Sequence, residues 1–251
     1  LLIAGTWLYL VLIRPTDWES VGGSTEALIT LSGYVGGTIL LLAGTLPHLP
    51  ARTIAIIPVA LALNILLGQV VGSIGVPLYL DAVGTVLVAA LAGPRAGLAT
   101  GALNSVVWAL FNPLALPFAA GSALTGWLAG MAIHRGAFRN LFTTIATGAG
   151  IGLITGAIAA PVAAFVYGGT AGVGTGALVS LFREMGNSLI ASVTWQSFIS
   201  DPLDKAIVLA LVFLVVRNLP KKTRRALAPR DLAVPDLRAQ EAAPGEGTRV
   251  S

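Results

Sequence analysis

The stretch that decides the fold class is SDPLDKAIVLALVFLVV, residues 200–216. Its apolar part is long enough to enter a bilayer, yet Asp201, Asp204 and Lys205 stand directly against it. Apolar runs of about 18 or more residues recur along the chain, and such runs predict membrane-spanning helices. They do not alternate apolar and polar residues, as the strands of an outer-membrane barrel do. The sequence therefore predicts an all-α integral membrane protein.

The composition supports this prediction. The chain of 251 residues is 55% hydrophobic and only 10% charged, whereas a soluble domain carries about 25% charged residues. It has no cysteine, which excludes disulfides and thiolate metal sites. The high pI comes from residues 220–251, where seven Lys/Arg face four Asp/Glu. We read this segment as a basic, disordered cytoplasmic tail and not as a nucleic-acid-binding region.

The hydrophobic runs divide the chain into three parts. Residues 1–51 hold two additional N-terminal transmembrane helices, residues 52–219 a six-helix membrane domain, and residues 220–251 the tail. Residues 176–199 are too polar for a comfortable lipid-facing crossing, and we expect them to cover the outer side of the bundle. The predicted helices are 1–13, 25–46, 52–73, 78–92, 95–111, 117–134, 139–167 and 201–217.

The charges sort by side of the membrane. With one crossing for each run and Arg52 inside, the remaining arginines at the joints also fall inside, and this positive-inside pattern predicts a cytoplasmic C-terminus. The other charged residues of the block from Arg52 to Arg217 all map to the outer half, as a polar site that opens outward would require. The inner residues are Arg95, Arg135, Arg139 and Arg217, and the outer ones Asp81, Arg183, Glu184, Asp201, Asp204 and Lys205.

The pair Asp201-Pro202 has the form of a helix start. Asp is a good N-cap, and Pro is favoured in the first helical turn. Lys205 lies one turn inside the last crossing, where an ionisable residue is a functional candidate. Both roles are compatible: the cap would fix the helix start, and the lysine would point into a pocket.

A polar face runs along the helix predicted over residues 95–111. Asn104, Trp108 and Asn112 recur at a spacing of four, which places them on one helical side. Either Asn104 makes an interhelical hydrogen bond, or these residues form a pocket for a flat heterocycle. Glu184 and Trp195 share a face in the same way, with Gln196 beside them; an interfacial helix is the alternative there.

Several kinds of chemistry have no motif in the chain. It has three lysines and no G-x-x-x-x-G-K-[ST] loop, so it cannot hydrolyse ATP by that route. Neither a metal-ligand spacing nor G-x-S-x-G occurs, and His48 and His134 stand alone at predicted cytoplasmic joints. We therefore expect a protein that is not an enzyme and that has no cofactor or metal.

A longer stretch carries a family resemblance. GVPLYLDAVGTVLVAALAGPRAGLATGALNSVVWALFNPLALPFAAGSALTGWLAG, residues 75–130, resembles the substrate-binding S components of energy-coupling factor (ECF) vitamin transporters. The features are an outer loop ending in LDAVGT, a GP-x-x-G turn, and a polar face followed by NP. Residues 200–222 resemble the closing helix of the same proteins, and the resemblance covers about 52–222.

The resemblance implies a function and its partners. S components are six-helix proteins of the bacterial cytoplasmic membrane that bind a vitamin or related micronutrient from outside. They dock on a transmembrane coupling protein with two ATPase subunits, and ATP hydrolysis makes the binding subunit topple and release its substrate inside. Thiamine or its pyrimidine precursor, riboflavin, pyridoxine-like compounds, cobalamin and a queuosine precursor all remain open as substrates.

Site residues follow by position from the resemblance. Trp108 and Trp195 would sandwich an aromatic ring, the amides would read its edge, and Asp204 and Lys205 would anchor polar groups. The family's A-x-x-x-A face for the coupling protein corresponds here to Ala60, Asn64, Gly68 and Gly72. The expected substrate-binding residues are Asp81, Asn104, Trp108, Asn112, Glu184, Asn187, Trp195, Gln196, Asp204 and Lys205.

Two other functions compete with this one. One is a membrane-embedded enzyme that acts on a lipid or isoprenoid headgroup through Asp201, Asp204 and Glu184. The other is a membrane sensor or scaffold whose polar residues only hold helices together. An importer subunit predicts a bound small molecule and an associated ATPase, the enzyme predicts turnover, and the scaffold predicts neither.

Overall fold

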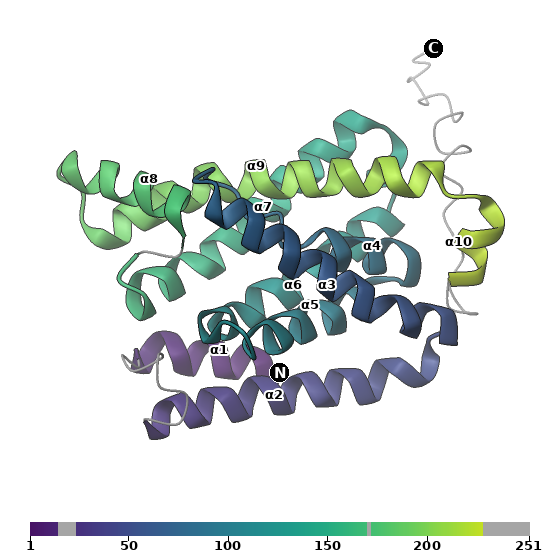
Figure 1. The fold of residues 1–251 in the computed structure, drawn as a ribbon, viewed down its shortest axis with the longest axis horizontal. Coiled ribbons are helices and arrows are strands. Elements are labelled where there is room, and N and C mark those ends of the chain that lie inside the picture. Colours follow the sequence, from purple (N-terminus) through teal and green to yellow (C-terminus); the bar gives the residue numbers. More distant parts are fainter. Residues whose placement is uncertain (15–23, 170–171, 228–251) are drawn as a thin grey trace, which may run out of the picture.

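The computed structural model describes residues 1–14, 24–169 and 172–227 (Figure 1). Helices make up 85% of the structure, and the part of the chain that it describes contains no strand, so the all-α prediction is confirmed. The helices are α1 (Leu2–Ile13), α2 (Thr25–Thr45), α3 (Ala51–Ser73), α4 (Val83–Ala92), α5 (Pro94–Trp108), α6 (Ala119–His134), α7 (Leu141–Val166), α8 (Val173–Glu184), α9 (Leu189–Asn218) and α10 (Lys221–Leu227). Short 3-10 turns join some of them: η1 (Leu46–His48), η2 (Pro113–Phe118) and η3 (Ala137–Arg139).

Four of the described helices are long and apolar enough to cross a membrane: Thr25–His48, Ala51–Ser73, Pro113–His134 and Leu141–Val166. Between 28% and 50% of the most apolar window of each is buried inside the protein. The remaining apolar surface faces outward, as it does where a helix meets lipid and not a protein core. These are the features of a membrane-embedded protein.

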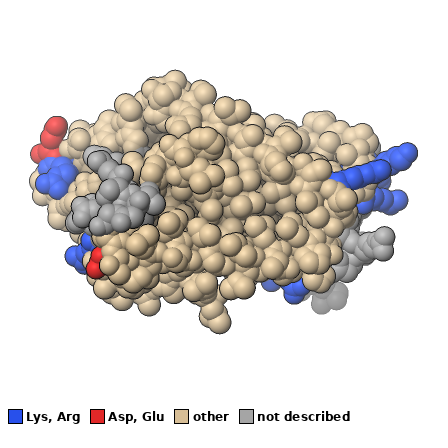
Figure 2. All heavy atoms as spheres, turned by 60° about the horizontal axis from the view of Figure 1, so that its bottom comes forward, with Lys and Arg blue, Asp and Glu red and all other residues tan. Residues whose placement is uncertain are grey.

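The charged side chains gather at the two ends of the molecule. On the face drawn in Figure 2, Lys and Arg alone lie at one end of the long axis, and both signs of charge lie at the other. The surface between them is free of charged side chains on that face. In Figure 1, α10 and α8 lie at these opposite ends of the same axis. On this face, an uncharged surface between two charged ends is the arrangement expected of a bilayer-spanning bundle.

The most extensive helix contact among the described residues joins α7 to α9. A Cβ on Gly148 would lie 2.5 Å from the Lys205 carbonyl oxygen, and one on Gly152 would lie 2.5 Å from the Pro202 Cα. A Cβ on the next glycine in the row, Gly156, would lie 3.0 Å from the Asp201 Oδ2. Small residues at a spacing of four let helices approach closely in lipid. This row of glycines therefore sets the position of Asp201 and Lys205 of α9 along α7.

The predicted helix start at Asp201-Pro202 is wrong. α9 runs without a break from Leu189 to Asn218, with Pro202 in its interior. The N-cap is Ser188, whose side chain accepts a hydrogen bond from the Ala191 N–H. A proline inside a membrane helix is tolerated because neighbouring helices compensate the lost hydrogen bond. Here α7 packs directly against the Pro202 turn, and Asp201 is free of a capping role.

The segment before α9 is broken where the sequence predicted one shared helical face. α8 ends at Glu184, and Gly186 adopts φ +91° between the two helices. Glu184 and Trp195 consequently belong to different helices, so the shared face predicted for them does not exist. Residues 176–199, which we expected to cover the outer side of the bundle, form most of α8 and the first turns of α9.

The predicted disordered tail begins with a helix. α10 packs against α3 and α4, and the Thr53 hydroxyl, near the start of α3, donates a hydrogen bond to the Leu227 carbonyl. Arg224 is buried in this contact. The rest of the predicted tail, residues 228–251, lies outside the described residues.

The two N-terminal helices pack against the rest of the protein. α1 contacts α6 and α7, and α2 contacts α5. The Trp7 indole N–H donates to the Ile158 carbonyl at 3.1 Å, and the Tyr34 hydroxyl donates to the Pro117 carbonyl at 3.3 Å. The second bond supports η2, which forms one wall of the cavity described next.

Candidate ligand-binding site

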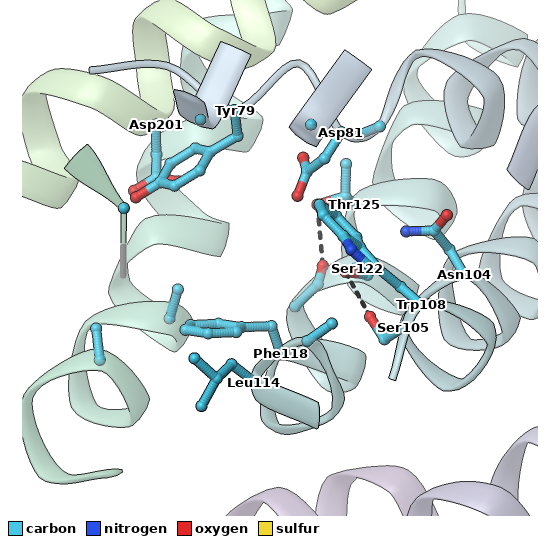
Figure 3. Close-up of a pocket in the computed structure, with 18 of the residues that line it drawn as sticks. Tyr79, Asp81, Asn104, Ser105, Trp108, Leu114, Phe118, Ser122, Thr125 and Asp201 are labelled. Carbon is cyan, nitrogen blue, oxygen red and sulfur yellow. Dashed lines mark hydrogen bonds between the residues drawn. The ribbon is translucent and has the colours of Figure 1, made fainter. Parts of the chain in front are cut away.

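A cavity of about 460 Å³ lies among α3, α5, α6, α7 and α9. Its size falls in the range of about 300–1,000 Å³ that is typical of small-molecule sites. Tyr79 and Asp201 lie on one side of it, Asp81 and Trp108 on another, and Phe118 lies across from them (Figure 3). The wall thus combines acidic groups, aromatic rings and small polar side chains, which is the composition of a site that orients a small ligand.

An ion-pair network closes the side of the cavity at α9. The Lys205 Nζ lies 2.6 Å from the Asp204 Oδ2 and 3.4 Å from the Asp81 Oδ1. Asp204 is fully buried, and its Oδ1 accepts hydrogen bonds from the N–H groups of Tyr79 and Leu80 at 2.8 and 2.7 Å. Leu80 adopts φ +50°, which is uncommon for a residue other than glycine. Asp204 therefore holds the loop before α4 against α9 in a constrained conformation.

Tyr79 links this loop to a second side chain of α9. Its hydroxyl accepts a hydrogen bond from the Gln196 Nε2 at 3.3 Å. Burial, followed by the negative charge of Asp201, raises the pKa of the Tyr79 phenol above its ordinary value. The hydroxyl consequently stays protonated and can donate a hydrogen bond.

Two polar atoms near the cavity lack a partner among the described residues. The Asp201 Oδ2 and the Trp108 Nε1 are both buried, and neither makes a hydrogen bond. A buried polar group without a partner costs free energy. Both residues line the cavity, so a ligand there could supply the missing donor or acceptor.

A buried asparagine organises the opposite wall. The Asn64 Nδ2 donates to the Thr85 hydroxyl at 2.9 Å and to the Asn104 Oδ1 at 3.2 Å, and its Oδ1 accepts from the Gly84 N–H at 2.7 Å. One amide therefore joins α3, α4 and α5. This interhelical bond is the first of the two roles expected for Asn104, and because Asn104 also lines the cavity, the second role stays compatible.

Aromatic rings form the other walls. Trp108 lies over Gly68, where a Cβ would come within 3.2 Å of the Trp108 Cζ2 and of the Asp81 Cβ, so the glycine makes room for the indole. Phe118 and Tyr167 stack with ring centroids 5.6 Å apart. The Ser105 hydroxyl donates to the Ser122 hydroxyl at 3.1 Å, and this bond joins α5 to α6 (Figure 3).

The structure brings half of the predicted substrate-binding residues together. The five that line the cavity are Asp81, Asn104, Trp108, Asn112 and Lys205. Asp204 and Gln196 lie behind the wall, where they bond to Lys205 and Tyr79. The other three do not line it: Glu184 is exposed, Asn187 bonds to the Phe182 carbonyl, and Trp195 is 54% exposed on the outside of α9.

Sequence reasoning missed several residues of the cavity. The sequence places Asp201 at a predicted helix cap, and Tyr79 is not among the predicted site residues. The tyrosine lies two residues before Asp81, and Asp201 lies one helical turn before Lys205; both spacings are signals that could have been used. For Phe118 and Tyr167, at the ends of two apolar runs, the sequence has no comparable signal.

The predicted partner-binding line is packed inside the chain. Ala60, Asn64 and Gly68 are buried, and Gly72 is half-buried. Gly84 of α4 sits so close to the Ala60 backbone that a Cβ there would come within 2.6 Å of the Ala60 carbonyl carbon. In this conformation the line joins α3 to α4 and to Trp108, so contact with a partner through it requires α3 to separate from them.

The described residues contain no group of three His, Cys, Asp or Glu side chains that could hold a metal ion. No known protein family, curated protein or solved structure matches the chain.

Proposed function

We propose that this chain is the substrate-binding subunit of an ATP-driven importer of the ECF type. It captures a vitamin or related micronutrient from outside and releases it inside by reorienting with a coupling protein and two ATPase subunits. In this proposal α3, α4, α5, α6, α7 and α9 form the six-helix S-component bundle. α8 covers its outer side, and α1 and α2 are an addition to it.

The cavity is the observation that carries the proposal. It unites residues from the two stretches whose sequence resembles S components: Asp81 and Trp108 from the first, Asp201 and Lys205 from the second. A scaffold has no need of a cavity lined with partnerless polar atoms. The mixture of aromatic rings and placed polar groups suits a planar, polar micronutrient.

The position of the cavity supports uptake from outside. Its rim includes Ser73, Asn112 and Tyr167, which lie at the ends of their helices away from α10. Lys and Arg dominate the end with α10, which by the positive-inside rule is the cytoplasmic side of a bacterial inner membrane. The cavity then opens toward the exterior, and the C-terminus lies in the cytoplasm.

The source of energy follows from what the sequence lacks. The chain has no P-loop motif, so in this proposal the ATP that drives accumulation is hydrolysed by subunits on other chains. The partner must also change the conformation of this subunit, because a ligand that enters the cavity from outside has to leave it on the inner side.

Purification of the tagged full chain from membranes of the organism that encodes it tests the proposal. We expect a second membrane protein and P-loop ATPase subunits to co-purify, and membrane vesicles to accumulate the bound small molecule only with ATP inside the compartment that holds the ATPases. Trp108→Ala should abolish accumulation and keep the ATPase subunits bound, because Trp108 faces the cavity and not the exterior. A chain that purifies without any ATPase, in vesicles that accumulate nothing, would contradict the importer.

A further inference from the structure

Most of the charged side chains that line the cavity are acidic. Of the ionisable side chains that line it, Asp81 and Asp201 are acidic and only Lys205 is basic. The lysine charge is matched by Asp204, which lies 2.6 Å away and is fully buried behind the wall. The contact of Lys205 with Asp81 is longer, at 3.4 Å. Lys205 thus pairs with two of the three carboxylates, and the formal charges leave the cavity with an excess of negative charge.

Asp201 is the least satisfied member of this group. Asp201 is 6% exposed, and its buried Oδ2 has no hydrogen-bond donor among the described residues. That oxygen lies against Gly156 of α7, where a Cβ would come within 3.0 Å of it. A charged donor from a ligand would give the Asp201 Oδ2 the hydrogen-bond partner that it lacks among the described residues.

The aromatic walls favour the same sign of charge. Tyr79, Trp108 and Phe118 line the cavity together with the two carboxylates. The faces of aromatic rings attract cations through their quadrupoles. The Lys205 Nζ already lies 5.9 Å from the centre of the Tyr79 ring, so a second cation would find the same ring and more carboxylates near it.

We propose that the cavity binds an organic cation, in which a planar ring carries a protonated amine. The amine pairs with Asp201 and Asp81, and the ring lies against Trp108 and Phe118. This inference rests on the proposed function, in that a small molecule occupies the cavity, and it adds the sign of that molecule's charge.

Three probes with one ring and different charge test the inference. Phenethylamine is a cation at pH 7, 2-phenylethanol is neutral, and phenylacetate is an anion. Each is titrated against the purified full chain in detergent by ligand-observed NMR, with protein-free micelles as the blank. The variants are Asp201→Asn and Asp81→Asn, and Glu184→Gln is the matched control because it removes one negative charge at an exposed position outside the cavity.

We expect phenethylamine to bind about tenfold or more tightly than either other probe, and each cavity variant to weaken it by about tenfold or more. Glu184→Gln should leave its affinity within about twofold, because an exposed charge is screened. Thermal unfolding of each variant shows whether it folds, and the unaltered chain tests the order of the three probes on its own.

Equal or tighter binding of phenylacetate or 2-phenylethanol, or no binding of phenethylamine, would overturn the cation assignment. So would an Asp201→Asn variant that folds and binds phenethylamine as the unaltered chain does. Failure of the proposed function gives a different result, namely a chain with no retained small molecule and no ATPase partner. A retained molecule that is neutral or anionic would sink the inference and leave the importer standing.

Discussion

Gly152 of α7 lies directly against Pro202 of α9, so closely that a Cβ at position 152 would be 2.5 Å from the Pro202 Cα. The glycine gives the proline turn a place to pack, and the proline turn carries Asp201 on one side of it. The cavity therefore depends on a backbone contact to which neither residue contributes a functional group. Changes at this contact should affect both the stability of the bundle and the binding of a ligand.

Gly152→Val should destabilise the protein, because the added side chain has to push α9 away from α7. Overpacking of this kind costs about 1–3 kcal/mol or more. Gly150→Val on the same helix is the matched control, since no atom lies within 4 Å of a Cβ at that position. Thermal unfolding in detergent would compare the two variants. Equal unfolding temperatures would show that the α7–α9 contact is looser than the structure has it.

Lys205→Met should destabilise the chain strongly, because it leaves the fully buried Asp204 without its cation. Breaking one partner of a buried ion pair costs about 3–5 kcal/mol. The double change Asp204→Asn with Lys205→Met should recover part of that loss, because no unpaired charge remains. Lys222→Met, at an exposed lysine of α10, serves as the control. A double variant no more stable than Lys205→Met alone would argue against the pair.

Asn64→Leu should weaken the junction of α3, α4 and α5, because it removes three hydrogen bonds and leaves the Gly84 N–H without an acceptor. The unsatisfied group costs about 1–3 kcal/mol. Asn218→Leu is the control, since that exposed side chain bonds only to the Leu214 carbonyl of its own helix. If both changes had the same small effect on unfolding, Asn64 would not be the link between these helices.

The helices themselves could be predicted from hydropathy, because a bilayer requires long apolar runs and satisfied backbone groups. Asn104 and Trp108 could also be placed on one cavity wall from their spacing alone. α5 ends at Trp108, yet Asn112 still reaches the cavity because its side chain caps η2 just beyond.

The errors arose where tertiary contacts override a local signal. Asp-Pro is a helix start in most contexts, but the glycine row on α7 packs against the turn at Pro202 and α9 continues through it. Trp195 shares no face with Glu184, because Gly186 breaks the helix between them. The contact between the α7 glycine row and the Pro202 turn joins distant segments and cannot be read from spacing along the chain.

Native mass spectrometry of the purified chain tests most directly whether this cavity holds a small molecule. The measurement compares the unaltered protein with Trp108→Ala and Trp195→Ala. Trp108 lines the cavity, whereas Trp195 is 54% exposed outside it. We predict a retained small molecule that is lost in Trp108→Ala and kept in Trp195→Ala. A protein that carries no small molecule, or one that keeps it in Trp108→Ala and loses it in Trp195→Ala, would contradict the site.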